Sequence, residues 1–236
     1  MVSSSSKSGR KWNISIPCKT KDRVKVYKGS VQVVRMRNTI VLHVLIALLP
    51  ITLLLLSANL VMYNPLAYSL GFWHAGTYDT FGVGEPDKAA NSMIAYFLWQ
   101  KELNLDITDN ERSHMSDVKD VMHSITAAFA LFLWCTVGCV LLLPDKRKAL
   151  LTASKQAIWL LAPLAIIMVF FSRSFVWFHE WFFPQGNYIF PPDAYLIRLL
   201  PEIFFIDMLL MIVLIFVVSS WILQLWAQGR FGRAGE

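Results

Sequence analysis

The chain has 236 residues, of which 56% are hydrophobic and 16% are charged, and its mean hydropathy is +0.48. Soluble domains carry about a quarter charged residues, so this composition argues against an ordinary soluble protein. The net charge of +6 is not accompanied by a basic-aromatic binding element, and we therefore predict no nucleic-acid partner.

Four apolar blocks, each of about 20 residues, predict membrane-spanning helices. They cover residues 39–63, 123–143, 156–172 and 203–226. These blocks are expected to be helical because an unpaired backbone polar group in lipid is costly. The first block lies too far from the N-terminus, and is too long, to be a cleavable signal peptide. We predict an all-α membrane protein, a bundle of four transmembrane helices with short interfacial helices on its outer face.

The distribution of positive charge predicts the orientation of the bundle. Sixteen of the 22 Lys and Arg residues lie in residues 1–38, in the connection 144–155 and in the tail 227–236. Lys and Arg are enriched in cytoplasmic loops, so both termini are expected to be cytoplasmic. The connections 64–122 and 173–202 then form the outer loops.

The N-terminal segment, residues 1–38, is rich in serine and then in Lys and Arg. A polybasic cytoplasmic segment can lie against anionic membrane lipids, and it can also dock a partner membrane subunit. Its alternating stretch Val24–Tyr27 could form a short strand.

The first outer loop contains two predicted helices. Residues Ala89–Leu103 have amphipathic spacing and could lie in the outer membrane interface. Thr108 and Glu111 fit a capping box, and the helix that they begin should run unbroken into the second span.

Counting along the helix that begins at Thr108 puts His114 roughly 13 Å above the hydrocarbon boundary. Counting along the third span puts His179 about one helical turn beyond the same boundary, so both histidines lie near lipid headgroups and ester carbonyls.

His114 and His179 are the candidate catalytic residues. A histidine with a pKa near 6.5 can take a proton from one group and give a proton to another. Acyl transfer needs both steps, and it also needs a donor for the tetrahedral oxyanion. For that donor we consider Lys119, Arg173, Asn187 or a backbone N–H group. The candidates for substrate binding or support are Asp117, Lys119, Arg173, Glu180, Asn187, Glu202 and Asp207.

Other interpretations of these polar residues stay open. The two histidines could be interfacial hydrogen-bonding residues only. A zinc site could use His114, Asp117, His179 and Glu180, but the spacing lacks the HExxH pattern, and we predict neither a metal nor a cofactor. Asp207 falls inside the fourth apolar block, where it should pair with Arg198 or Arg173. No catalytic role is predicted for His43, His74 or His123.

Three stretches resemble a known family. These are Ser113–Lys119, Phe178–Asn187 and Pro192–Phe205, the last containing Leu200-Pro201-Glu202 followed by Phe204-Phe205. They are similar to the lipoprotein intramolecular transacylase (Lit)-like family of four-span membrane proteins of bacteria and archaea. The resemblance covers about residues 38–226 and leaves the basic N-terminal segment outside. Met115 departs from the family, in which an aromatic residue more often follows the first histidine.

The resemblance implies a membrane acyltransferase, with His114 and His179 as the essential pair. Its substrate would be a diacylglyceryl-cysteine lipoprotein, in which one acyl chain moves from a glycerol oxygen to the cysteine α-amine. The expected location is the cytoplasmic (inner) membrane of a prokaryote, as a multi-pass protein in contact with membrane lipids. Two alternatives are a non-enzymatic transmembrane subunit of a larger complex that retains the family scaffold, and a metal-dependent membrane hydrolase.

Overall fold

The computed structural model describes residues 20–98 and 102–229, and all regular secondary structure in these ranges is helical. Four helical stretches are long and apolar enough to cross a membrane, namely Val31–Met62, Asp109–Leu142, Lys146–Val169 and Glu202–Ala227. The prediction of an all-α, multi-pass membrane protein with four transmembrane helices is confirmed. The helices are longer than the apolar blocks because polar residues at their ends continue the same helical backbone.

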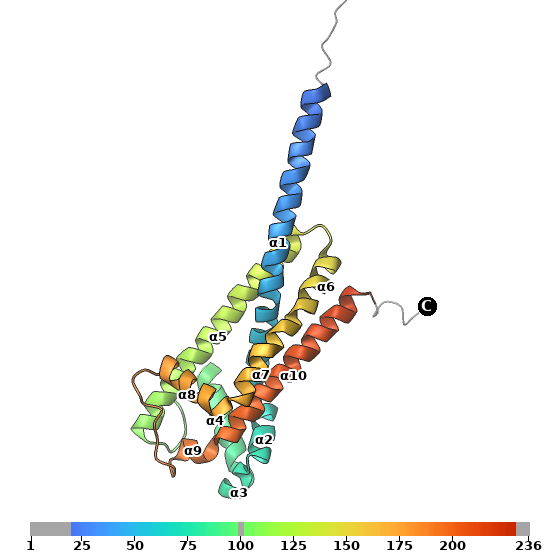
Figure 1. Cartoon of the computed structure of the whole chain (residues 1–236). Coiled ribbons are helices and arrows are strands. Elements are labelled where there is room, and N and C mark those ends of the chain that lie inside the picture. The colour runs from blue at the N-terminus through green and yellow to red at the C-terminus, as the bar shows by residue number, and fades with distance from the viewer. Residues whose placement is uncertain (1–19, 99–101, 230–236) are drawn as a thin grey trace, which may run out of the picture. The chain divides into compact units, whose positions relative to one another are not determined.

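Three of these stretches are single helices (Figure 1): α1 (Thr20–Met62), α5 (Asp109–Leu142) and α10 (Glu202–Ala227). The remaining stretch, Lys146–Val169, consists of three consecutive segments: α6 (Lys146–Gln156), the 3₁₀ turn η1 (Ala157–Leu160) and α7 (Leu161–Val169). Residues 144–155 were expected to be a connection that precedes the third span, whereas the structure makes Lys146–Gln156 the first helix of that span. The helix begins at Lys146 because the side chain of Asp145 caps it, accepting a 3.0 Å hydrogen bond from the Lys148 N–H.

The chain divides into two compact units, Met1–Thr39 and Ile40–Glu236. In the first unit, α1 is already helical from Thr20, so the strand considered for Val24–Tyr27 is wrong. Residues 1–19 lie outside the described ranges, and the predicted role of the basic N-terminal segment stays a prediction. The candidate site belongs entirely to the second unit.

One hydrophobic cluster of the second unit joins the four long stretches. Its buried members include Leu45 and Leu49 of α1, Ala153 of α6 and Phe216 of α10. Polar side chains connect the same helices: Thr52 and Thr136 place their hydroxyl oxygens 2.8 Å apart between α1 and α5. Ser220 of α10 donates to the backbone oxygen of Ser154 in α6 at 3.1 Å. Such contacts satisfy polar groups that lipid would leave unpaired.

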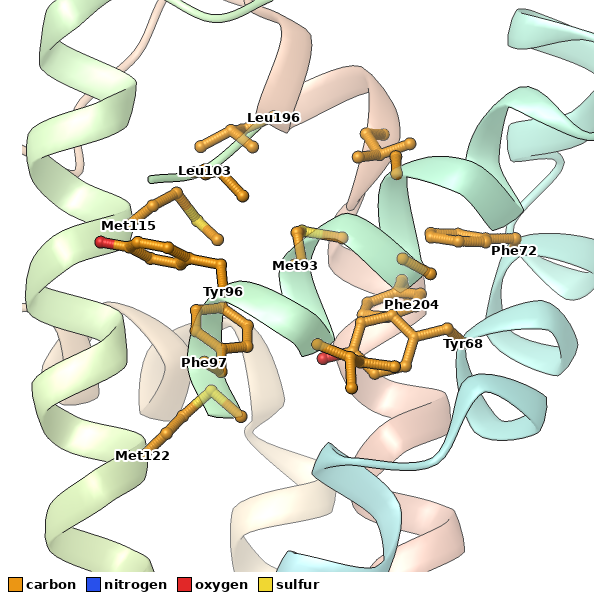
Figure 2. Packing of buried hydrophobic residues seen from close by; sticks show 14 residues of the cluster. Tyr68, Phe72, Met93, Tyr96, Phe97, Leu103, Met115, Met122, Leu196 and Phe204 are labelled. Carbon is orange, nitrogen blue, oxygen red and sulfur yellow. The ribbon is translucent and has the colours of Figure 1, made fainter. Parts of the chain in front are cut away.

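A second cluster surrounds the short helix α4 (Glu85–Leu98), which packs against α2 (Pro65–His74) and the first half of α5. In Figure 2, Met93, Tyr96 and Phe97 of α4 lie between Met115 and Met122 of α5 and the aromatic side chains of Tyr68, Phe72 and Phe204. The amphipathic helix predicted for Ala89–Leu103 could have placed its apolar face in the membrane interface; the helix ends at Leu98, and residues 99–101 of the predicted range lie outside the described ones. The structure shows instead that its apolar face is buried in this cluster.

The chain changes direction sharply between the third span and the helix that follows it (Figure 1). Phe170, with φ −109° and ψ 38°, ends α7, and α8 (Phe171–Phe182) begins at the next residue. Earlier in the span, the 3₁₀ turn lies just before Pro163, which has no N–H to donate to the preceding turn. Because of the break, α8 is free to leave the direction of the span and approach α5.

Candidate active site

The imidazole rings of His114 and His179 face each other in the structure. His114 belongs to α5 and His179 to α8, and their ring centroids are 5.8 Å apart with an angle of 28° between the planes. The capping box predicted for Thr108 and Glu111 is present at the start of α5, and the helix runs from there without a break to Leu142. The two candidate catalytic residues, predicted on different spans, are therefore brought into one place.

Aromatic side chains enclose the two rings. Phe183, which is 1% exposed, lies 4.7 Å from the ring of His114 and 5.5 Å from that of His179 between centroids. Phe175 and Tyr188 pack against His179 at 4.3 Å and 5.1 Å, and Phe190 packs against His114 at 5.6 Å. His114 is 7% exposed and His179 is half-buried, so the pair lies in an apolar enclosure.

The surroundings of His179 fix its tautomer. Its Nδ1 lies 2.8 Å from the backbone oxygen of Phe175. A carbonyl oxygen can only accept, so Nδ1 carries the hydrogen and the Nε2 of the neutral ring carries a lone pair. Burial lowers the pKa of His179 below its ordinary value, against the smaller opposing effect of the Phe175 bond. The ring is therefore neutral near pH 7 and can accept a proton at Nε2.

A hydrogen-bonded network lies beside His114. The Asn187 amide nitrogen donates to Asp117 at 2.5 Å and to Ser113 at 3.3 Å. Gln185 donates to the same Asp117 oxygen at 2.5 Å. The amide nitrogen of Asn187, which we had considered as an oxyanion donor, is thus engaged with Asp117.

Glu111 joins two segments that are distant in the chain, a connection that the sequence did not reveal. It is 2% exposed, and Oε2 accepts from both the backbone N–H and the hydroxyl of Thr108 at 2.9 Å. Its other oxygen accepts from the backbone N–H of Leu196 at 2.8 Å, in the helix α9 (Tyr195–Leu199). The capping-box pattern predicted the contact with Thr108, but a contact with a residue so distant in the chain has no local signal.

Asp207 is held by a partner that we did not expect. Its carboxylate lies 2.8 Å from Nδ1 of His74, a residue for which no role was predicted. The expected pairing with Arg198 or Arg173 is wrong: Arg198 lies over the ring of Phe81, and Arg173 over the ring of Trp177. His74 ends the short helix α2, whose packing against α10 brings the two together.

The remaining predicted support residues lie in different surroundings. Glu202 accepts a 2.5 Å hydrogen bond from the hydroxyl of Ser172, which links the start of α10 to the start of α8. The ammonium group of Lys119 lies 4.2 Å from the centre of the Tyr96 ring. Glu180 is exposed. Among the predicted support residues, Asp117 and Asn187 lie beside His114 and are hydrogen-bonded to each other.

Within residues 20–98 and 102–229, no group of three or more His, Cys, Asp and Glu side chains is arranged to hold a metal ion. The zinc site considered from His114, Asp117, His179 and Glu180 therefore has no assembled ligand set there. The chemistry that the described side chains offer is proton transfer by two imidazoles in an apolar enclosure.

The fold and this histidine pair define an integral membrane protein with a candidate acid–base site. The family model for lipoprotein intramolecular transacylase Lit matches residues 43–205, and the chain belongs to this family. No curated protein matches the sequence.

Solved structures of one family member share the fold. Lipoprotein intramolecular transacylase Lit from Bacillus cereus is 23% identical, with a TM-score of 0.72 over 83% of this chain and 95% of that chain. A variant of the same protein with one histidine replaced by alanine gives 21% identity and a TM-score of 0.72, over 84% and 96% of the two chains. A variant with a histidine replaced by arginine is 21% identical, with a TM-score of 0.71 over 91% of this chain and 100% of that chain.

Proposed function

We propose that this protein transfers an acyl chain within a diacylglyceryl-cysteine lipoprotein, from a glycerol oxygen to the α-amine of the lipidated cysteine. The observation that carries the proposal is the contact between the rings of His114 and His179, 5.8 Å apart between centroids. Family membership supports the same reaction. Both rings belong to segments that the sequence places near the depth of lipid ester groups.

The reaction needs protons to move at two substrate atoms. The substrate amine begins as an ammonium group, and a neutral imidazole accepts one of its protons. The freed nitrogen attacks the ester carbonyl, so that an N–C bond forms and the C–O bond to glycerol breaks. The leaving glycerol oxygen takes a proton from one imidazolium, while the attacking nitrogen gives its second proton to the other ring. The amide keeps one proton, and one is released to water.

The two histidines are suited to these steps. His179 is neutral near pH 7 because burial lowers its pKa, so its Nε2 can accept the first proton. Two rings in contact can serve one reacting centre and exchange roles without moving far. The apolar enclosure formed by Phe183 and its neighbours favours neutral reactants and limits access of water to the ester.

The proposed location is the cytoplasmic membrane of a prokaryote, with both termini inside. The basic residues of the N-terminal segment, of the connection 144–155 and of the tail support this orientation. The histidine pair then faces the outer leaflet, where a lipoprotein presents its diacylglyceryl group. Single cysteines introduced into the tail and into the loop 173–202 should react with an impermeant reagent from opposite sides of the membrane.

The activity is tested by expressing the chain with a reporter lipoprotein in cells that lack such an enzyme. Mass spectrometry of the N-terminal lipopeptide should show an N-acylated lyso-form. His114→Ala and His179→Ala should each lower its yield by roughly 10²–10⁴-fold, the usual contribution of acid–base catalysis. His43→Ala, which replaces an exposed histidine of α1, is the control and should leave the yield unchanged.

Two results would contradict the proposal in different ways. An absence of N-acylated product from the folded wild-type protein would reject the transacylase activity. A product made at the full rate by either alanine variant of the pair would reject the two-histidine mechanism but keep the reaction.

A further inference from the structure

Two buried polar atoms near the histidine pair have no hydrogen-bond partner. They are Nδ1 of His114 and Oδ1 of Asn187, and in the described part of the chain no other buried side-chain nitrogen or oxygen is left in this way. An unpaired polar atom that is sealed from water is unfavourable, so each of these atoms needs an explanation. Asn187 lies beside the ring-bearing turn of α5, because its amide is hydrogen-bonded to Ser113, the residue before His114, and to Asp117, three residues after it.

The orientation of the Asn187 amide follows from its neighbours. An amide can be turned so that its oxygen and nitrogen exchange places, and the hydrogen-bond network has to decide between the two orientations. Here the group 2.5 Å away is the carboxylate of Asp117, which accepts hydrogen bonds, so the nitrogen must point toward it. The hydroxyl of Ser113 lies on the same side, 3.3 Å from this nitrogen. The oxygen of Asn187 is consequently the atom left for His114.

Neither unpaired atom is accessible from outside. Because both are sealed from solvent, a water molecule or a substrate cannot reach them without a rearrangement of the site. They can, however, satisfy each other if the ring of His114 carries its hydrogen on Nδ1 and turns slightly toward the amide. This solution needs no additional molecule.

We propose that Asn187 is a positioning residue for His114: its Oδ1 accepts the Nδ1 hydrogen and thereby leaves Nε2 to exchange protons with the substrate. Asp117, assisted by Gln185, holds the amide in the orientation that this requires. The functional role rests on the transacylase activity proposed above, but the hydrogen bond itself does not depend on turnover.

The two histidines then form a matched pair. His179 donates from Nδ1 to the backbone oxygen of Phe175, and His114 donates from Nδ1 to the side-chain oxygen of Asn187. Each ring therefore offers the same nitrogen, Nε2, to the reacting atoms. Such a match suits a reaction in which one imidazole gives a proton while the other takes one.

The first test measures which nitrogen of His114 carries the hydrogen. Full-length protein labelled with ¹⁵N-histidine, in lipid nanodiscs above pH 8, should show His114 as the Nδ1–H tautomer, assigned by loss of its signals in His114→Ala. In Asn187→Ala this preference for Nδ1 should be lost. The control Asn110→Ala, which replaces an exposed asparagine of α5, the helix that carries His114, should preserve it. An unchanged Nδ1–H tautomer in folded Asn187→Ala would overturn the inference.

The second test exchanges the two side chains of the network. Asn187→Asp alone places two carboxylates together and should lower the yield of N-acylated product at least tenfold. Adding Asp117→Asn places an amide at position 117 opposite the carboxylate at position 187, so one donor again faces one acceptor. The double variant should therefore recover most of the lost yield. No recovery in a double variant that folds like the wild type would also overturn the inference.

The two proposals can fail separately. If the wild-type chain makes no N-acylated lipopeptide but the tautomer of His114 responds to Asn187→Ala, the transacylase proposal fails and the positioning role of Asn187 stands. If the product forms and the tautomer does not respond, the reaction stands and His114 is oriented by other contacts.

Discussion

The buried carboxylate of Glu111 accepts a 2.8 Å hydrogen bond from the backbone N–H of Leu196, and this bond ties the start of α5 to the start of α9. The other carboxylate oxygen of Glu111 is bonded to Thr108. His114 follows Glu111 by three residues on the same helix. These hydrogen bonds of Glu111 therefore hold the helical turn that carries the ring of His114.

Replacing Glu111 should destabilise the packing of α9 against the start of α5. Glu111→Ala leaves the N–H groups of Thr108 and Leu196 without their acceptor, and we expect a loss of roughly 2–4 kcal/mol in the free energy of unfolding. Thermal unfolding in detergent measures the effect, and product yield should fall with it. Asp120→Asn changes an exposed carboxylate of the same helix and should have no effect. A Glu111→Ala protein as stable as the wild type would show that the hydrogen bonds of Glu111 do not contribute to stability.

Gly71 permits the close approach of α2 to α10. A Cβ atom at this position would lie 2.7 Å from Cδ2 of Phe204, a side chain that is 3% exposed. Gly71→Ala should therefore destabilise the protein by about 1–3 kcal/mol, although alanine is the better helix former.

A second substitution distinguishes this clash from other causes. Adding Phe204→Leu to Gly71→Ala removes the atoms that the new methyl group would meet, so the double variant should lose less stability than the sum of the two single variants. Additive losses in thermal unfolding would show that the Phe204 ring is not what limits the helix approach.

The protonation of His179 should respond to the exposure of its ring. Because burial lowers its pKa, the NMR titration midpoint of His179 should lie below 6.5, and activity that needs its neutral form should persist as the pH falls through 6.5 and be lost at lower pH. Phe178→Ala uncovers the ring, whose centroid lies 5.6 Å from that of Phe178, and should raise the midpoint toward 6.5.

The control for this titration is Trp181→Ala. Trp181 is 84% exposed and lies on the same helix, so its removal should leave the midpoint of His179 where it was. A midpoint at or above 6.5 in the wild type would contradict the effect of burial.

The sequence predicted the four long helices because each needs an apolar stretch of about 20 residues, and such stretches are visible without any tertiary information. Counting residues along the helices also predicted that His114 and His179 both lie near the outer membrane boundary, and this depth stays a prediction. The count for His179 did not include the break at Phe170. The start of α5 was predictable as well, because the capping box at Thr108 is a local pattern.

Contacts between distant segments were not predictable in the same way. The pairing of Asp207 with His74 depends on how α2 folds back against α10, and the bond from Leu196 to Glu111 depends on where α9 docks. The amphipathic pattern of α4 indicated one apolar face, but it could not distinguish a lipid surface from the buried cluster around Met93.

The break at Phe170 separates the ring of His179 from the long apolar helix that precedes it. A continuous helix would carry His179 about 15 Å beyond Val169 along the axis of the third span. It would also make the ring follow every change in the tilt of that span. The short helix α8 is instead attached to α5 through the side chains around His114, such as Phe183. We therefore expect a change in the tilt of the third span, such as a bilayer of different thickness imposes, to move the ring of His179 less than it would in a continuous helix.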